Sequence, residues 1–130
     1  MTNQELIAKA KEVMTRAYAP YSHFQVGAAL LAKDGRVFTG CNVENATYGA
    51  TICAERTAMT KAVSEGVREF EKIAIVASSG EYAAPCGICR QVLFEFMPEG
   101  KVVLWSELEG EKEFALTELL PFGFRGEDIK

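Results

Sequence analysis

The sequence predicts an α/β fold, a three-layer α/β/α sandwich in which helices cover both faces of a five-stranded mixed sheet. Two observations carry this prediction: a hairpin of two β-rich runs comes early in the chain, and helical and strand-like segments alternate after it. At 130 residues, the chain is long enough for one hydrophobic core and too short for two of ordinary size. We therefore expect a single domain over residues 1–130.

The N-terminal half contains a helix followed by the hairpin. Apolar residues recur at helical spacing over residues 2–19, and Pro20 marks the latest end of that helix. Residues 24–32 and 36–43 are β-rich and are separated by a K-D-G turn at 33–35. Because Asp-Gly between two such runs is a strong hairpin signal, these strands should pair antiparallel.

The middle of the chain predicts a helix and a central strand. After a polar loop at 44–51, residues 53–66 are predicted to form a helix that stops at Gly66, so the loop delivers Cys53 to a helix start. Residues 71–78 contain the continuous apolar run IAIVA, which is typical of a strand buried on both faces.

The C-terminal part adds a helix, two strands and a short helix. Pro85 is expected in the first turn of a helix that runs to residue 97, because proline is tolerated there, and this places Cys86 at a second helix start. Residues 101–106 and 112–116 are predicted strands, and residues 117–120 a short helix.

Composition argues against two classes of partner. The net charge of -4 and the pI near 5.1 disfavour nucleic acid, because that binding depends on Lys and Arg displacing counterions. No apolar run approaches the roughly 18 residues of a spanning helix, and the N-terminus lacks the apolar core of a signal peptide. We therefore expect no membrane association and a cytoplasmic location, where cysteines are more often reduced thiols or metal ligands than disulfides.

Three cysteines are candidates for one metal centre. Cys86 and Cys89 are spaced so that both sulfurs lie on one helix face, but this pair alone also fits a redox motif or half of a structural zinc site. Cys53 at a second helix start favours a metal, because converging helix N-termini place N–H groups and positive dipole ends beside thiolates. Catalytic zinc typically has three protein ligands and a fourth position for water.

The other polar residues bear on whether that site is open. Cys41 and His23 are the candidates for a fourth ligand, and we expect neither to bind, since a free cysteine in a strand is most often a small buried hydrophobe. In an open site Glu55 can exchange protons with activated water, although acidic residues are also common in first helical turns. Arg56 either offsets the negative charge of three thiolates or is a solvated helix charge, and Arg90 is a second candidate for that role.

Five motifs span nearly the whole chain. They are Y-A-P-Y-S-x-F-x-V-G-A-A-L at 18–30, G-C-N-V-E-N at 40–45, C-A-E-R at 53–56, P-C-G-I-C-R-Q at 85–91 and L-L-P-F-G-F at 119–124. Together they resemble the short, homotetrameric cytidine deaminase family, whose zinc site includes a P-C-x-x-C signature and a glutamate that is not a ligand. The resemblance implies a cytidine deaminase-like fold and one Zn²⁺ per chain. It also implies hydrolytic deamination of free cytidine and 2′-deoxycytidine to uridine and 2′-deoxyuridine, with release of ammonia, in pyrimidine salvage.

The resemblance also implies roles for individual residues. Zinc held by Cys53, Cys86 and Cys89 activates water to attack C4 of the pyrimidine, while Glu55 moves protons to N3 and to the departing ammonia. Phe24 packs against the nucleoside, and Asn42 and Glu44 hydrogen-bond ribose hydroxyls. The other implied substrate contacts are Val43, Ala54 and Phe124. A neighbouring subunit of a homotetramer is implied to contribute the C-terminal aromatic and a loop made of Ala46, Thr47, Tyr48 and Gly49.

Other classes of protein remain as alternatives. Blasticidin-type deaminases share the cysteine site but lack the N-x-E-N motif and the arginine after C-A-E, and this chain has both. Deaminases of RNA or single-stranded DNA typically use His as the first ligand and need a basic channel, so a free nucleoside is the favoured substrate. A zinc-stabilised interaction module would show no deamination. A thiol-disulfide enzyme would use Cys86 and Cys89 without a metal.

Overall fold

The structure, a computed structural model, describes residues 1–129, so Lys130 of the predicted domain lies outside the described residues. Its helices are α1 (Asn3–Met14), α2 (Ala54–Ser64), α3 (Gly87–Phe96) and α4 (Leu116–Leu119), with short 3₁₀ turns η1 (Tyr48–Ala50) and η2 (Gly126–Ile129). Its strands are β1 (Val26–Ala32), β2 (Val37–Cys41), β3 (Phe70–Ala77), β4 (Lys101–Ser106) and β5 (Gly110–Ala115).

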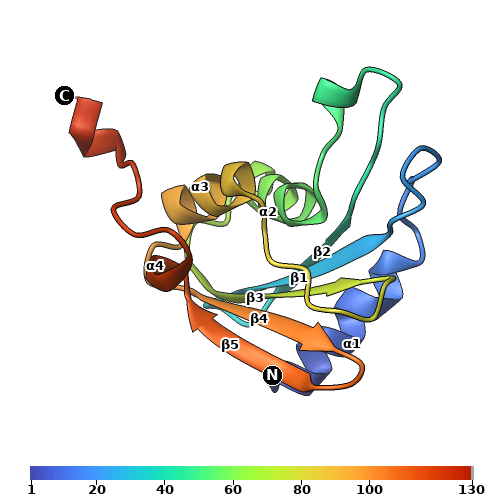
Figure 1. Cartoon of the computed structure of the whole chain (residues 1–130). Helices are drawn as coiled ribbons and strands as arrows, with labels where there is room; N and C mark the ends of the chain where they lie inside the picture. Colours follow the sequence, from blue (N-terminus) through green and yellow to red (C-terminus); the bar gives the residue numbers. More distant parts are fainter. Residues whose placement is uncertain (130) are drawn as a thin grey trace.

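These strands form one mixed sheet in the order β2-β1-β3-β4-β5, with β3 and β4 parallel and the other neighbours antiparallel. Figure 1 shows α1 on one face of the sheet and α2 and α3 on the other. The predicted three-layer sandwich and antiparallel first hairpin are confirmed, and β3 occupies the predicted central position. Within residues 1–129, no helix is both long and apolar enough to cross a membrane.

Alternation of side chains along the central strands builds two cores. On β1, Ala28 and Leu30 face the core under α2 and α3, whereas Ala29 and Leu31 face α1. β3 and β4 follow the same period of two, as expected when successive side chains point to opposite faces. The sheet is therefore apolar on both sides, which explains why IAIVA shows no polar alternation.

The first helix is shorter than predicted, because it ends at Met14 and not near residue 19. After Met14 the chain forms a turn in which Ala17 N–H donates to the Met14 carbonyl, and Tyr18 then pairs with the segment around Val43. This pairing with a segment distant in sequence takes Tyr18 out of the helix. A tertiary contact thus overrides the helical pattern of the local sequence. At the other end of the helix, Thr2 and Glu5 form a capping box.

The place of α2 depends on a glycine in the edge strand. A Cβ atom at Gly40 of β2 would lie 2.5 Å from the backbone nitrogen of Ala58 and 2.6 Å from the Ala54 carbonyl oxygen. Only glycine therefore allows the first turns of α2 to approach β2 this closely. This contact fixes the start of α2, and with it Cys53, above the sheet.

Candidate metal centre and adjoining cavity

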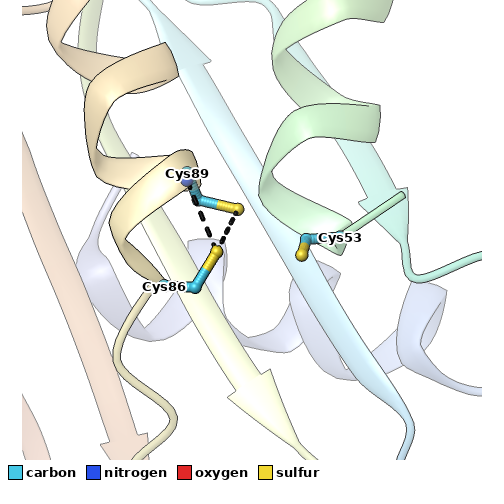
Figure 2. A group of neighbouring side chains, drawn as sticks. All are labelled: Cys53, Cys86 and Cys89. Atoms are coloured by element: carbon cyan, nitrogen blue, oxygen red, sulfur yellow. Dashed lines mark hydrogen bonds between the residues drawn. The ribbon is translucent and has the colours of Figure 1, made fainter. Parts of the chain in front are cut away.

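Three thiols lie together where two helices begin. The sulfur atoms of Cys53, Cys86 and Cys89 all lie within 4.8 Å of one another, and the Cys86 and Cys89 sulfurs are 3.4 Å apart. Figure 2 shows the two α3 side chains directed across a gap toward Cys53 at the start of α2. The sequence predicted both the set of cysteines and their position at two helix starts, and the structure brings them together.

The local chain explains how each cysteine is placed. Cys53 and Cys86 are the N-cap residues of α2 and α3, with extended backbones, and Cys89 lies in the first turn of α3. The Cys86 sulfur accepts a hydrogen bond from the Cys89 N–H, as a serine or aspartate cap would. Pro85 precedes this cap, so the prediction that it lies in the first helical turn is wrong by two positions.

The donor set fits a zinc ion. Zinc–thiolate bonds of about 2.3 Å in a tetrahedron separate two sulfurs by about 3.8 Å, which is close to the spacing of this cluster. Cys41, at the end of β2, and His23, in the 18–25 turn, do not join the cluster in the part of the chain that the structure describes. The cluster therefore supplies three ligands, the number that leaves one position for water.

Electrostatics at the cluster favour a thiolate on Cys53. Hydrogen bonding from the Cys89 thiol, followed by the Arg56 guanidinium, lowers the pKa of Cys53 to about 5. The same bond to Cys53, together with burial, raises the pKa of Cys89. Without a metal the cluster thus carries one thiolate most readily, and a divalent cation would be needed to hold all three deprotonated.

Glu55 is a buried acid beside this cluster. Its side chain is 5% exposed and forms no salt bridge with any residue in 1–129, although charged side chains are seldom buried unless paired. Burial, with a further contribution from the Cys53 thiolate, raises its pKa to about 7. A carboxyl group in a cavity suits proton transfer when its pKa lies close to neutral pH.

The two arginines after the cysteines behave differently. The Arg56 guanidinium donates to the Cys53 sulfur at 3.6 Å and to the Thr51 carbonyl at 3.3 Å, which agrees with the first of its two predicted roles, contact with the thiolates. Arg90 donates instead to the carbonyls of Pro85 and Leu119, at 2.7 and 2.8 Å. Arg90 therefore fastens the loop before Cys86 to the end of α4 and does not contact sulfur.

A cavity of about 250 Å³ opens from the cluster. Its lining includes Cys53, Glu55 and Cys86 together with the apolar side chains of Phe24, Val26 and alanines 54, 83 and 84. The polar residues Ser22, Asn42, Glu44 and Thr51 line the same cavity. The predicted contacts Phe24, Asn42, Glu44 and Ala54 thus line the same cavity as the metal centre. Ser22 also lines it; it stands in the motif at 18–30, but no role was predicted for it, because its contact with Glu44 is visible only in the folded chain.

Asn42 and Val43 serve the backbone around this cavity. The Asn42 side chain accepts from Val26 N–H at 2.9 Å and donates to the Phe24 carbonyl at 2.8 Å, which fixes the approach to β1. The Val43 backbone pairs with both Tyr18 and Ile52, and its side chain is 44% exposed. Val43 does not line the cavity in this chain.

The remaining predicted contacts lie away from the cavity of their own chain. Tyr48 on η1 is 74% exposed, and Phe124 lies in the C-terminal tail, where its backbone bonds the side chain of Gln91. Figure 1 shows the η1 loop and the tail projecting from opposite ends of the molecule. Neither segment lines the cavity in the described part of the chain, although the Tyr48 ring packs edge-on against Tyr21, with ring centroids 5.9 Å apart.

The raised pKa of Glu55 predicts a stability effect in metal-free protein. The folded carboxyl keeps its proton to about pH 7, whereas the unfolded one ionises near 4.5, so ionisation favours unfolding as the pH rises between these values. We predict that Glu55→Gln raises the free energy of unfolding by about 2–3 kcal/mol more at pH 8 than at pH 5.

Urea unfolding of chelator-treated wild type and variant at both pH values measures this difference. The comparison with wild type is needed because Cys53 acts with the opposite sign: its lowered pKa stabilises the folded state as the pH rises above about 5. If the free energy of unfolding differed between variant and wild type by the same amount at pH 5 and at pH 8, Glu55 would ionise normally.

Known proteins share this sequence and architecture. A family model described as "Cytidine and deoxycytidylate deaminase zinc-binding region" matches residues 1–105. A cytidine deaminase from Halalkalibacterium halodurans is 51% identical over 99% of this chain and 98% of its own length, and one from Sporosarcina psychrophila is 48% identical over 99% and 96%. The crystal structure of a cytidine deaminase from Burkholderia pseudomallei superposes with a TM-score of 0.91, at 49% identity over 95% of this chain and all of that one. The chain belongs to the cytidine and deoxycytidylate deaminase family.

Proposed function

We propose that this chain is a zinc-dependent enzyme that hydrolyses free cytidine and 2′-deoxycytidine to uridine and 2′-deoxyuridine with release of ammonia. The observation that carries the proposal is the cluster of three thiols with buried Glu55 beside a cavity. The likeness to cytidine deaminases over nearly the whole chain supports the substrate.

The side chains of the cysteine cluster and its neighbours Glu55 and Arg56 account for the chemistry. Zinc on Cys53, Cys86 and Cys89 would supply a Lewis acid that makes water nucleophilic at neutral pH. As the water oxygen bonds to C4, Glu55 takes one of its protons and delivers it to N3; Glu55 then passes the second proton of that oxygen to the amino group, so that the C4–N bond breaks and ammonia leaves. Arg56 reduces the negative charge of the cluster by bonding to the Cys53 sulfur.

The rest of the cavity fits a neutral nucleoside. The Phe24 ring and alanines 54, 83 and 84 offer apolar surface to a pyrimidine, and the Glu44 carboxylate offers an acceptor to a sugar hydroxyl. The cavity contains no Lys or Arg among its lining residues in the described part of the chain, so nothing there favours a phosphate. A nucleoside is therefore a better fit than a nucleotide.

A homotetramer would bring the exposed segments of one chain to the cavity of another. In the single chain Phe122 is fully exposed, Phe124 is 56% exposed and Tyr48 is 74% exposed. Aromatic surface of this kind commonly marks contacts between proteins. We propose that the loop of residues 46–49 and Phe124 complete a neighbouring site. A cytoplasmic location and a place in pyrimidine salvage stay predictions from the sequence.

The Gln91 side chain gives a test of this role for the tail. Its amide donates to the Phe124 carbonyl at 2.7 Å and accepts from the Phe124 N–H at 3.3 Å, so it holds the tail against α3. We predict that Gln91→Ala raises KM for cytidine about 3–10-fold and weakens assembly, as expected for the loss of one or two hydrogen bonds.

Steady-state kinetics and sedimentation velocity check this prediction, with Gln4→Ala on the exposed side of α1 as the matched control. If Gln91→Ala leaves both KM and the sedimentation coefficient unchanged, the tail does not complete the site.

Ultraviolet absorbance of cytidine incubated with zinc-loaded protein tests the function directly. We expect the cytidine signal to fall steadily at neutral pH, with uridine as the product by chromatography. A folded, zinc-loaded protein that leaves cytidine and 2′-deoxycytidine intact would refute the proposed substrates, and turnover of blasticidin S in the same assay would identify the alternative deaminase class.

A further inference from the structure

The cavity lining includes a carboxylate, that of Glu44, which is held by a single short segment. One oxygen of Glu44, Oε1, accepts hydrogen bonds from the backbone N–H groups of Tyr21 and Ser22, at 3.0 and 3.1 Å. The other, Oε2, accepts a hydrogen bond from the Ser22 hydroxyl. Three uncharged donors from two adjacent residues therefore set the orientation of Glu44.

The Ser22 hydroxyl is itself oriented by the chain. Its oxygen accepts a hydrogen bond from the Phe24 N–H at 3.0 Å. A hydroxyl has one hydrogen, and with this acceptor position occupied the hydrogen is free to point at Glu44. Through its hydroxyl, Ser22 therefore connects two cavity-lining residues, Phe24 and Glu44.

The backbone around Ser22 is fastened at both ends. His23 adopts a left-handed conformation with φ of 59°, and its N–H bonds the Ala19 carbonyl at 3.0 Å. Tyr18 N–H bonds the Asn42 carbonyl, and Glu44 N–H bonds the Tyr18 carbonyl. Because these bonds tie the turn to the segment that carries Glu44, the serine and the carboxylate are held in a fixed relation.

This arrangement leaves Glu44 with a defined capacity for a ligand. A carboxylate offers about four acceptor positions, and three are used by the turn, so one remains on Oε2. Hydrogen bonding from Ser22 also lowers the pKa of Glu44, which keeps it ionised at neutral pH. One hydroxyl donor of a ligand can therefore bind to an acceptor whose direction is already set.

We infer that Ser22 is a positioning residue, which holds the Glu44 carboxylate so that its remaining acceptor position faces one sugar hydroxyl of the substrate. The inference rests on the proposed function, because it requires a nucleoside with its base near the cysteines. In the described part of the chain the hydrogen bonds of Ser22 go to Glu44 and Phe24, so it acts on binding through Glu44 and not on the reacting atoms.

Ser22→Ala in the zinc-loaded enzyme tests the inference. We expect KM for cytidine to rise about 5–20-fold with kcat within about twofold, the effect of losing a hydrogen bond to a charged group. Ser22→Thr keeps the hydroxyl and is expected to retain nearly the wild-type KM. In a Glu44→Gln background, the same serine substitution should change KM by less than about twofold, since there is no longer a charge to position.

Ser78→Ala is the matched control. Its hydroxyl accepts from Gln25 N–H at 3.0 Å, so it bonds the same stretch of backbone, but it does not line the cavity. We expect its KM to equal that of the wild type. Equal effects of Ser22→Ala with and without Glu44, or a rise in KM with Ser78→Ala, would overturn the positioning role. Wild-type protein that does not turn over cytidine would instead refute the proposed function.

Discussion

Replacing Glu55 by glutamine is expected to lower kcat for cytidine by about 10³-fold while the protein keeps its zinc and its fold. General acid–base catalysis typically contributes 10²–10⁴-fold, and Glu55 is the acidic residue that lines the cavity beside the cysteines. Glutamine has nearly the same shape but cannot take up or release a proton at neutral pH. The reaction would then lose its proton carrier while the sulfur cluster stayed intact.

Three measurements on the same preparation separate the interpretations: kcat, zinc per chain and the circular dichroism spectrum. Glu65→Gln is the matched control. Glu65 is exposed at the opposite end of the same helix, and this substitution makes the same chemical change. Full activity in Glu55→Gln would show that another group moves the protons. Loss of zinc together with activity would assign Glu55 to the metal site itself, and an interaction module would have no activity to lose.

Local sequence patterns predicted the architecture and the centre of the site. The continuous apolar run IAIVA, the Asp-Gly turn and the glycine at residue 66 are all local signals, and the elements they predict exist. The cysteine cluster was predictable because Cys53 and Cys86 each mark a helix start, where backbone N–H groups and a cap favour thiolates. The residues nearest the proposed chemistry were therefore those with the strongest local signature.

The features that the sequence did not predict depend on contacts between distant segments. The early end of α1 follows from the pairing of Tyr18 with Val43, and the partners of Arg90 include a carbonyl 29 positions away. Ser22 belongs to the motif at 18–30 but had no predicted role, because its importance lies in reaching Glu44, 22 positions along the chain. Such side chains are specified by tertiary packing, and only the folded structure identifies their partners.

Replacing Cys89 by alanine is expected to remove zinc from the protein and, with it, at least 10³-fold of the activity on cytidine. Cys89 is fully buried beside the other two sulfurs, and alanine at this position offers no atom that can bind a metal. Two thiols would remain, fewer than the three or four protein ligands that zinc sites typically use. Zinc per chain after gel filtration under reducing conditions measures the loss.

Cys41→Ala is the control for that experiment, because Cys41 is the free cysteine outside the cluster and lies at the end of β2. It should keep about one zinc per chain and wild-type kcat. The pair of variants also decides between metal and redox chemistry. If wild-type protein isolated under reducing conditions carried no zinc and instead reduced disulfides through Cys86 and Cys89, the short spacing of their sulfurs would reflect a thiol pair. If zinc follows Cys89 and not Cys41, that spacing is the geometry of a metal site, because a redox pair has no need of the third thiol on α2.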